Sequence, residues 1–133
     1  MTELKNSAIA LTGAAGGFGQ EFTRQLLQAG SHLILTDLDQ GILQEQVIAI
    51  QNEIKTGKVI ACFGLDLSTS EGAQTFYKAV KALNIPVDLL INNAGIGLYG
   101  RMDEVPSQTW EQLMQVNLLA PMRLTSLFMA DMI

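Results

Sequence analysis

The chain has 133 residues, of which 48% are hydrophobic, and its formal net charge is −5. This length suits one domain with a real core, which we expect to span residues 1–133. The acidic balance, without a basic stripe, argues against a nucleic-acid partner. No apolar run reaches the ~18 residues of a membrane span, and residues 1–6 do not read as a signal peptide, so we expect a cytoplasmic protein without a membrane partner. The single cysteine, Cys62, excludes an internal disulfide, and the lone histidine, His32, has no second ligand with which to hold a metal.

Strands and helices are predicted to alternate along the whole chain. The predicted elements are strand 6–12, helix 18–29, strand 32–36, helix 40–56, strand 58–64, helix 70–83, strand 87–92 and a final helix 107–132. Such alternation is typical of an α/β fold whose doubly wound parallel sheet is covered by helices on both faces. Right-handed crossovers then predict the strand order 3-2-1-4, with a ligand at the carboxyl ends of the strands.

A glycine-rich turn between the first strand and the first helix carries the most specific motif. Its glycines Gly13, Gly17 and Gly19 follow a G-x-x-x-G-x-G spacing. We interpret Gly13 as the tight turn, Gly17 as the point where a pyrophosphate approaches the backbone, and Gly19 as a close helix–strand contact. Unpaired N–H groups at the helix start favour an anion. The alternative is an ordinary turn, but the strand before and the helix after favour a dinucleotide site.

The second strand ends at Asp37, which bears on the choice of cofactor. A carboxylate there can accept hydrogen bonds from both hydroxyls of an adenine ribose and repels a 2′-phosphate. No arginine or lysine stands at Gly16 or Leu38, where such a phosphate needs a cation. The alternative role is a helix N-cap, which Asp39 can provide equally well. The ribose interpretation predicts that NAD is preferred over NADP.

The third and fourth strands also end in residues suited to a ligand. Asp66 can bond the adenine amino group while Leu67 covers the ring, or Asp66 can be a turn acid before a helix cap at Ser68 or Ser70. Residues 92–95 place two asparagines before two small residues, which allows the backbone to approach a ligand closely.

Together these motifs resemble those of the short-chain dehydrogenase/reductase family over the whole chain. The matching positions are Thr12, Gly13, Gly17, Gly19, Asp37, Asp66, Leu67, Asn92, Asn93, Ala94, Gly95 and Asn117. The resemblance implies a Rossmann-like fold and a hydride transfer between a nicotinamide cofactor and an alcohol or carbonyl substrate. It implies that Thr12, Gly13, Gly17, Phe18 and Gly19 bind the cofactor, that Asp66 and Leu67 hold the adenine, and that Asn93, Ala94 and Gly95 line the nicotinamide-side ribose.

Asn117 falls in the middle of the apolar stripe of the final helix. A buried amide is costly without a partner, and Pro121 has no N–H for the carbonyl of residue 117. We therefore expect a kink there that leaves this carbonyl free for a water. The resembled family uses an asparagine at this position to hold a water of its proton relay, which makes Asn117 the candidate catalytic residue. The alternative is an asparagine that only fixes the helix register.

One part of the family pattern is missing. The family's serine and its Tyr-x-x-x-Lys pair follow the last helix, and none of them occurs before Ile133. Tyr77 and Lys81 have the right spacing but precede the fourth strand, so we interpret Tyr77 as packing and Lys81 as solvated surface. We therefore expect a chain that stops before a fifth strand and has no turnover of its own. A stand-alone dinucleotide-binding module or an inactive fragment is the alternative function.

The fourth strand and the final helix predict self-association. Strand 87–92 would form a sheet edge with no lysine or proline to guard it. The final helix carries more apolar surface than one sheet face can cover, and in the resembled family this helix helps to form a subunit interface. We expect a homo-oligomer.

Overall fold

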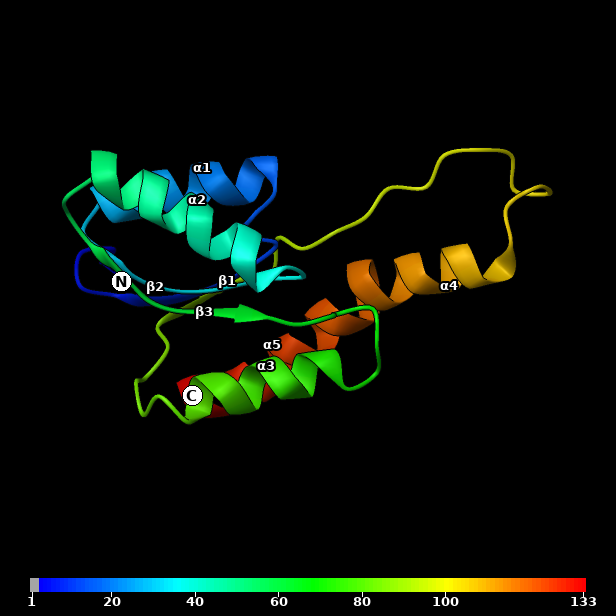
Figure 1. Ribbon diagram of the computed structural model, residues 1–133. Coiled ribbons are helices and arrows are strands. Elements are labelled where there is room, and N and C mark those ends of the chain that lie inside the picture. The colour runs from blue at the N-terminus through cyan, green and yellow to red at the C-terminus, as the bar shows by residue number, and fades with distance from the viewer. Residues whose placement is uncertain (1–2) are drawn as a thin grey trace.

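A four-stranded parallel sheet forms the centre of the computed structural model, which describes residues 3–133 (Figure 1). The strands are β1 (Ala8–Thr12), β2 (His32–Asp37), β3 (Lys58–Gly64) and β4 (Leu89–Ile91). Their order is β3-β2-β1-β4 and every pairing is parallel, which confirms the predicted topology. The carboxyl ends of all four strands therefore meet at one edge of the sheet.

Helices cover both faces of this sheet. The helical segments are α1 (Gly17–Gln28), α2 (Gln40–Glu53), α3 (Gly72–Lys81), α4 (Ser107–Met114), the π-helical turn η1 (Gln115–Leu119) and α5 (Ala120–Met132). Of these, α4 has no buried residue and extends past the sheet (Figure 1). Figure 1 shows α1 and α2 on one face, and α3 with α5 on the other. Within residues 3–133, no helix has the length and apolar character needed to cross a bilayer.

The core consists of two apolar clusters, one on each face of the sheet. Alternate strand residues belong to different clusters, as expected from the period of two in a strand. Ile9 and Leu11 of β1 pack with Leu27 of α1, whereas Ala10 between them packs with Phe76 and the residues of α3 and α5. β1 is buried along its whole length because both faces and both edges are covered.

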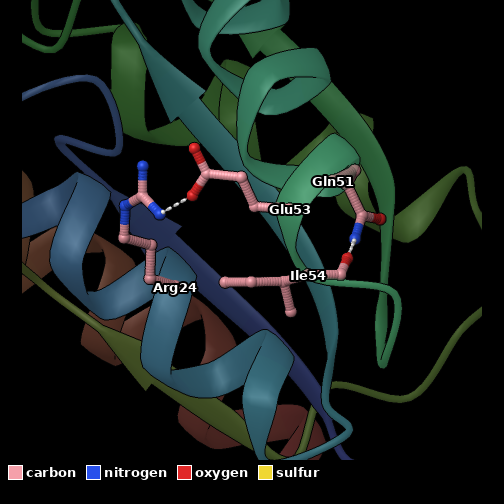
Figure 2. A network of polar contacts seen from close by, with 4 residues as sticks. All are labelled: Arg24, Gln51, Glu53 and Ile54. Carbon is pink, nitrogen blue, oxygen red and sulfur yellow. Dashed lines mark hydrogen bonds and ion pairs between the residues drawn. The ribbon is translucent and has the colours of Figure 1, made fainter.

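A surface ion pair joins α1 to α2 near the end of α2 (Figure 2). Arg24 Nη1 lies 2.7 Å from Glu53 Oε2. In the same region, Gln51 Nε2 donates to the Ile54 carbonyl at 2.9 Å, and the Ile54 side chain is buried in the core. Both members of the ion pair are exposed, so solvent screening keeps its contribution small and the buried contacts below it set the helix packing.

Several predicted elements are shorter in the structure, and for β4 and α3 hydrogen bonds account for the difference. β4 covers residues 89–91 rather than 87–92, and Asp88 instead bonds Ala8 with both its backbone and its side chain. The Asp88 N–H donates to the Ala8 carbonyl at 2.8 Å, and Asp88 Oδ2 accepts from the Ala8 N–H at 2.9 Å. α3 begins at Gly72 rather than residue 70, because a turn precedes it in which the Gly72 N–H bonds the Thr69 carbonyl at 3.3 Å.

The predicted helix 107–132 is divided by the π-helical turn η1. The Ala120 N–H bonds the carbonyl of Gln115, five residues before it, so this turn contains one more residue than an α-helical turn. Pro121 stands in the first turn of α5, where a missing N–H is tolerated. The break thus lies just before Pro121, close to the kink that the sequence predicts, but its form is a π turn.

Candidate functional site

Two glycines of the turn after β1 are required by the fold itself. Gly13 has a φ of +64°, and a Cβ there would lie 2.8 Å from backbone atoms of Ala94. A Cβ on Gly19 would overlap the Gly13 carbonyl oxygen. The tight turn at Gly13 is confirmed, and Gly19 makes its close contact with the turn itself rather than with the strand.

Gly17 differs from both, because a Cβ there would meet no atom of the described residues within 4 Å, apart from its chain neighbours and its own helix. It is the first residue of α1, it is exposed, and it lines a cavity. The fold therefore does not require a glycine here, and the predicted approach of a pyrophosphate at position 17 is compatible with this open space. This is the geometry expected where a diphosphate meets the backbone.

The start of α1 presents free backbone donors to the same space. The N-cap residue Gly16 has no side chain to cap the helix, and the first intrahelical bond runs from the Gln20 N–H to the Gly16 carbonyl at 2.9 Å. The N–H groups of residues 17–19 consequently have no acceptor within the helix. The helix dipole adds a partial positive charge at this end, so the first turn fits an anion.

The cavity in front of α1 has a volume of about 520 Å³ and crosses the carboxyl ends of the strands. This volume falls within the roughly 300–1,000 Å³ typical of small-molecule sites. Nine of the predicted site residues line it: Gly13, Gly17, Phe18, Asp37, Asp66, Leu67, Asn93, Ala94 and Gly95. Thr12, Gly19 and Asn117 do not line it. Residues that the sequence did not assign to the site also line it, among them Ala15, Leu38, Ile96, Gln112 and Val116.

Asp37 stands at the end of β2, with its carboxylate bonded to the glycine-rich turn. Oδ2 accepts from the Ala15 N–H at 2.8 Å and Oδ1 from the Leu38 N–H at 2.7 Å. Asp39 is the N-cap of α2 and accepts from the Ile42 N–H at 3.0 Å, so Asp37 does not have this role. A carboxylate has about four acceptor sites, which leaves Asp37 capacity to accept hydroxyl groups from a ligand.

Asp66 has the turn role that the sequence left open. Its Oδ1 accepts from the Ser68 N–H at 2.8 Å and from Ser68 Oγ at 2.6 Å. Neither predicted cap is present, because Glu71 is the N-cap of α3 and makes no side-chain capping bond. Both Asp66 and Leu67 line the cavity, so a contact with an adenine is compatible with this turn.

The end of β4 is tied to the end of β1 by Thr12. The hydroxyl of Thr12 accepts from the N–H groups of Asn93 at 3.0 Å and Ala94 at 2.9 Å, while Asn93 Nδ2 donates to the Gly13 carbonyl at 3.1 Å. Thr12 is 1% exposed and lies behind the cavity wall. In this structure Thr12 therefore holds the end of β4 against the turn, and a direct contact with the cofactor stays a prediction.

Asn117 is exposed, so the prediction that it lies on the buried stripe is wrong. The π turn shifts the helix register, with the result that Val116 and Ala120 face the core instead. The Asn117 amide pairs on both sides with the backbone of Ile96, as Oδ1 accepts from its N–H and Nδ2 donates to its carbonyl, each at 2.8 Å. This pairing anchors the loop after β4 to η1.

Tyr77 and Lys81 lie outside the cavity and contact α5. The Tyr77 hydroxyl donates to Asp131 Oδ2 at 2.7 Å, Lys81 Nζ lies 3.3 Å from the same oxygen, and the Tyr77 ring packs edge-on against Phe128. The hydrogen bond to Asp131 raises the pKa of Tyr77, whereas a tyrosine that acts as a base needs a lowered pKa. The packing role of Tyr77 and the surface position of Lys81 are confirmed.

Tyr77→Phe should leave the affinity for NADH unchanged. The substitution removes one hydroxyl bond between α3 and α5 and touches no residue of the cavity. We also expect no alcohol oxidation by residues 1–133, with or without the substitution. Fluorescence titration with NADH and an absorbance assay of NADH formation measure the two effects. Turnover that disappears in Tyr77→Phe would show that this tyrosine is catalytic.

Comparison with known proteins agrees with this geometry. A family model described as short chain dehydrogenase matches residues 7–133. The chain is 35% identical over 127 residues to the dehydrogenase/reductase SDR family member FEY of Arabidopsis thaliana. The alignment covers 92% of this chain and 34% of that protein. It is 31% identical over 120 residues to the CLA biosynthesis dehydrogenase/reductase of Lactiplantibacillus plantarum. That alignment covers 90% of this chain and 41% of the relative.

Solved structures give the same result. A metagenomic short-chain oxidoreductase in complex with NADP matches with a TM-score of 0.87 and 30% identity, covering 98% of this chain and 58% of that one. The chain spans 34% and 41% of the lengths of the two curated relatives named above. Because the family match extends over residues 7–133, the chain belongs to the short-chain dehydrogenase family.

Proposed function

We propose that the chain forms the nicotinamide dinucleotide site of an oxidoreductase that transfers a hydride between the cofactor and an alcohol or carbonyl substrate. The observation that supports this most is the open start of α1. Three features coincide at this point: free N–H groups, a glycine at which an added Cβ would contact none of the described residues, and a cavity of about 520 Å³. Among the described residues, no contact requires a glycine at position 17.

Each part of a dinucleotide would be held by a different strand end. The N–H groups of residues 17–19 would bind the diphosphate, Asp37 the adenosine ribose, Asp66 with Leu67 the adenine, and residues 93–95 the nicotinamide-side ribose. The cofactor, when bound, supplies or accepts the hydride at its nicotinamide ring. The side chain of Asn117 would hold the loop that starts at Ile96. The main-chain carbonyl of Asn117 would accept a hydrogen bond from a water of the proton relay.

NAD is the cofactor we propose for this chain. Asp37 borders the cavity with Leu38 beside it, and neither Leu38 nor Gly16 offers a cation to a 2′-phosphate. The metagenomic relative was solved with NADP, so both cofactors have to be compared directly on this chain.

Fluorescence titration of residues 1–133 with NADH tests the proposed site. We expect saturable binding that ADP competes for, because the diphosphate contacts the start of α1. An absence of binding by both NADH and NADPH would overturn the proposal. A dinucleotide-binding module without catalysis is the second candidate, since residues 3–133 bring no tyrosine–lysine pair to the cavity. Alcohol-dependent reduction of NAD by the protein would exclude that candidate.

We propose that the chain self-associates. β4 pairs only with β1, so its other edge is open within the described sheet. Beside it, the last helices expose large apolar side chains: Leu118, Met122, Met129 and Met132. Their burial between two copies would remove this surface from water. Sedimentation velocity at micromolar concentration should show a dimer or a larger species, and a monomer at every concentration would contradict this prediction.

A further inference from the structure

We propose that Gln20 and Gln46 are positioning residues that hold the glycine-rich turn in the geometry that binds a diphosphate. The inference rests on the proposed dinucleotide site. The group that they hold is the backbone carbonyl of Ala15, a residue in the middle of the turn that lines the cavity.

Two amides from different helices converge on this carbonyl. Gln20 Nε2 of α1 lies 3.0 Å from the Ala15 oxygen, and Gln46 Nε2 of α2 lies 3.2 Å from it. The Ala15 N–H donates to Asp37 Oδ2 at 2.8 Å. Both backbone polar groups of Ala15 are thus held by side chains, and these come from three separate elements of the fold.

The position of this carbonyl decides whether the turn attracts or repels an anion. Gly16 and Gly17 follow Ala15, and glycines allow the peptide between Ala15 and Gly16 to rotate at little cost. A rotated peptide would turn a carbonyl oxygen, with its partial negative charge, toward the diphosphate, and would break the bond from the Gly16 N–H to Gly13. Donors from Gln20 and Gln46 oppose that rotation before the ligand arrives.

Gln46 is an unfavourable residue for the stability of the fold at this position, and packing alone does not explain its presence. Among the described residues, its Oε1 is buried and has no hydrogen-bond partner. An unsatisfied buried acceptor destabilises a fold, so a methionine of similar length would suit this position better if its only task were to fill space. The bond from Nε2 to the Ala15 carbonyl accounts for an amide here. The expected signature of Gln46→Met is therefore weaker ligand binding without a loss of stability.

The test compares Gln46→Met, Gln20→Met and the double variant with Gln44→Met, which changes an exposed glutamine of the same helix. NADH is titrated by fluorescence, ADP and adenosine are measured by competition, and thermal midpoints are recorded. Each single variant should bind NADH and ADP roughly threefold to tenfold more weakly, as expected for one lost hydrogen bond. Adenosine, which lacks the diphosphate, should bind as before.

Three further results belong to the same expectation. The thermal midpoint of Gln46→Met should equal or exceed that of the unmodified chain. The double variant should lose more NADH affinity than the product of the single losses, because either amide alone still restrains the carbonyl. Gln44→Met should change nothing.

The results that overturn the inference differ from those that overturn the proposed function. Unchanged NADH affinity in Gln46→Met, equal losses for adenosine and ADP, or affinity that falls together with stability would each refute the positioning role. If the unmodified chain binds neither NADH nor ADP, the dinucleotide site itself is wrong and the inference fails with it.

Discussion

Gly17→Ala should abolish most dinucleotide binding and leave the fold intact, whereas the same substitution at Gly19 should destabilise the fold. A Cβ at position 17 would have no described residue packed against it within 4 Å and would stand where the diphosphate is expected to approach the start of α1. We expect NADH affinity to fall at least about tenfold, equivalent to roughly 1.4 kcal/mol. The thermal midpoint should be unchanged or slightly raised, because alanine is the better helix former.

At Gly19 the added Cβ would overlap the Gly13 carbonyl oxygen, a backbone atom, so the backbone itself would have to shift. Overpacking of this kind costs about 1–3 kcal/mol or more. Thermal denaturation followed by circular dichroism measures this loss, and NADH fluorescence measures the loss at Gly17. A Gly17→Ala variant with the original affinity would refute the diphosphate role, and a Gly19→Ala variant with the original stability would refute the packing role.

The unmodified chain should bind NADH about tenfold or more tightly than NADPH, and Asp37 should account for the difference. Repulsion of the 2′-phosphate and the loss of two hydroxyl contacts together are worth roughly 1–3 kcal/mol. Asp37→Asn keeps the size of the side chain and one acceptor for the Ala15 N–H, but it removes the charge. This variant should bring the two affinities close together, mainly through tighter binding of NADPH.

A cation beside this position should then reverse the preference. Leu38→Arg combined with Asp37→Asn places a guanidinium at the border of the cavity, where it can pair with a 2′-phosphate. Parallel fluorescence titrations with NADH and NADPH measure the ratio in each variant. Leu38→Arg alone serves as the control, since the remaining carboxylate should pair with the arginine and limit the gain. Equal affinities in the unmodified chain, or tighter binding of NADPH, would contradict the role of Asp37.

The layered fold could be predicted from the sequence because its signals are local. The spacing of apolar residues, with a period of about two in strands and about 3.6 in helices, predicted the elements. The right-handedness of crossover connections predicted the order of the strands in the sheet. The strand ends were predicted well for a related reason: a parallel sheet brings its carboxyl ends to one edge. Gly13, Asp37 and Asn93 therefore line one cavity although they are far apart in the chain.

The errors lie where a side chain competes with the backbone or where a helix changes its period. Asp88 bonds Ala8 through its carboxylate, which shortens β4 beyond anything that strand propensity indicates. The π turn displaces Asn117 from the buried face. One extra residue in a helical turn changes the direction in which the side chains before it point relative to those after it. Pro121 indicated that the helix was interrupted, but not the form of the interruption.

The role of the Ala15 carbonyl was equally inaccessible from the sequence. Gln46 is 31 residues away from Ala15, and helical periodicity places it beside a buried face without showing what its amide touches. Contacts of this kind depend on how two helices sit on the sheet, which the pattern of a single helix does not encode.

The pairing of Asn117 with Ile96 has a consequence for how this site can vary among related proteins. The amide bonds the main-chain N–H and carbonyl of residue 96, a residue that also lines the cavity. The bonds that fix the loop therefore do not depend on which side chain residue 96 carries. Evolution, or a protein engineer, can exchange the isoleucine for a larger or smaller residue and retune what the cavity accepts, as long as the asparagine on the opposite side is kept.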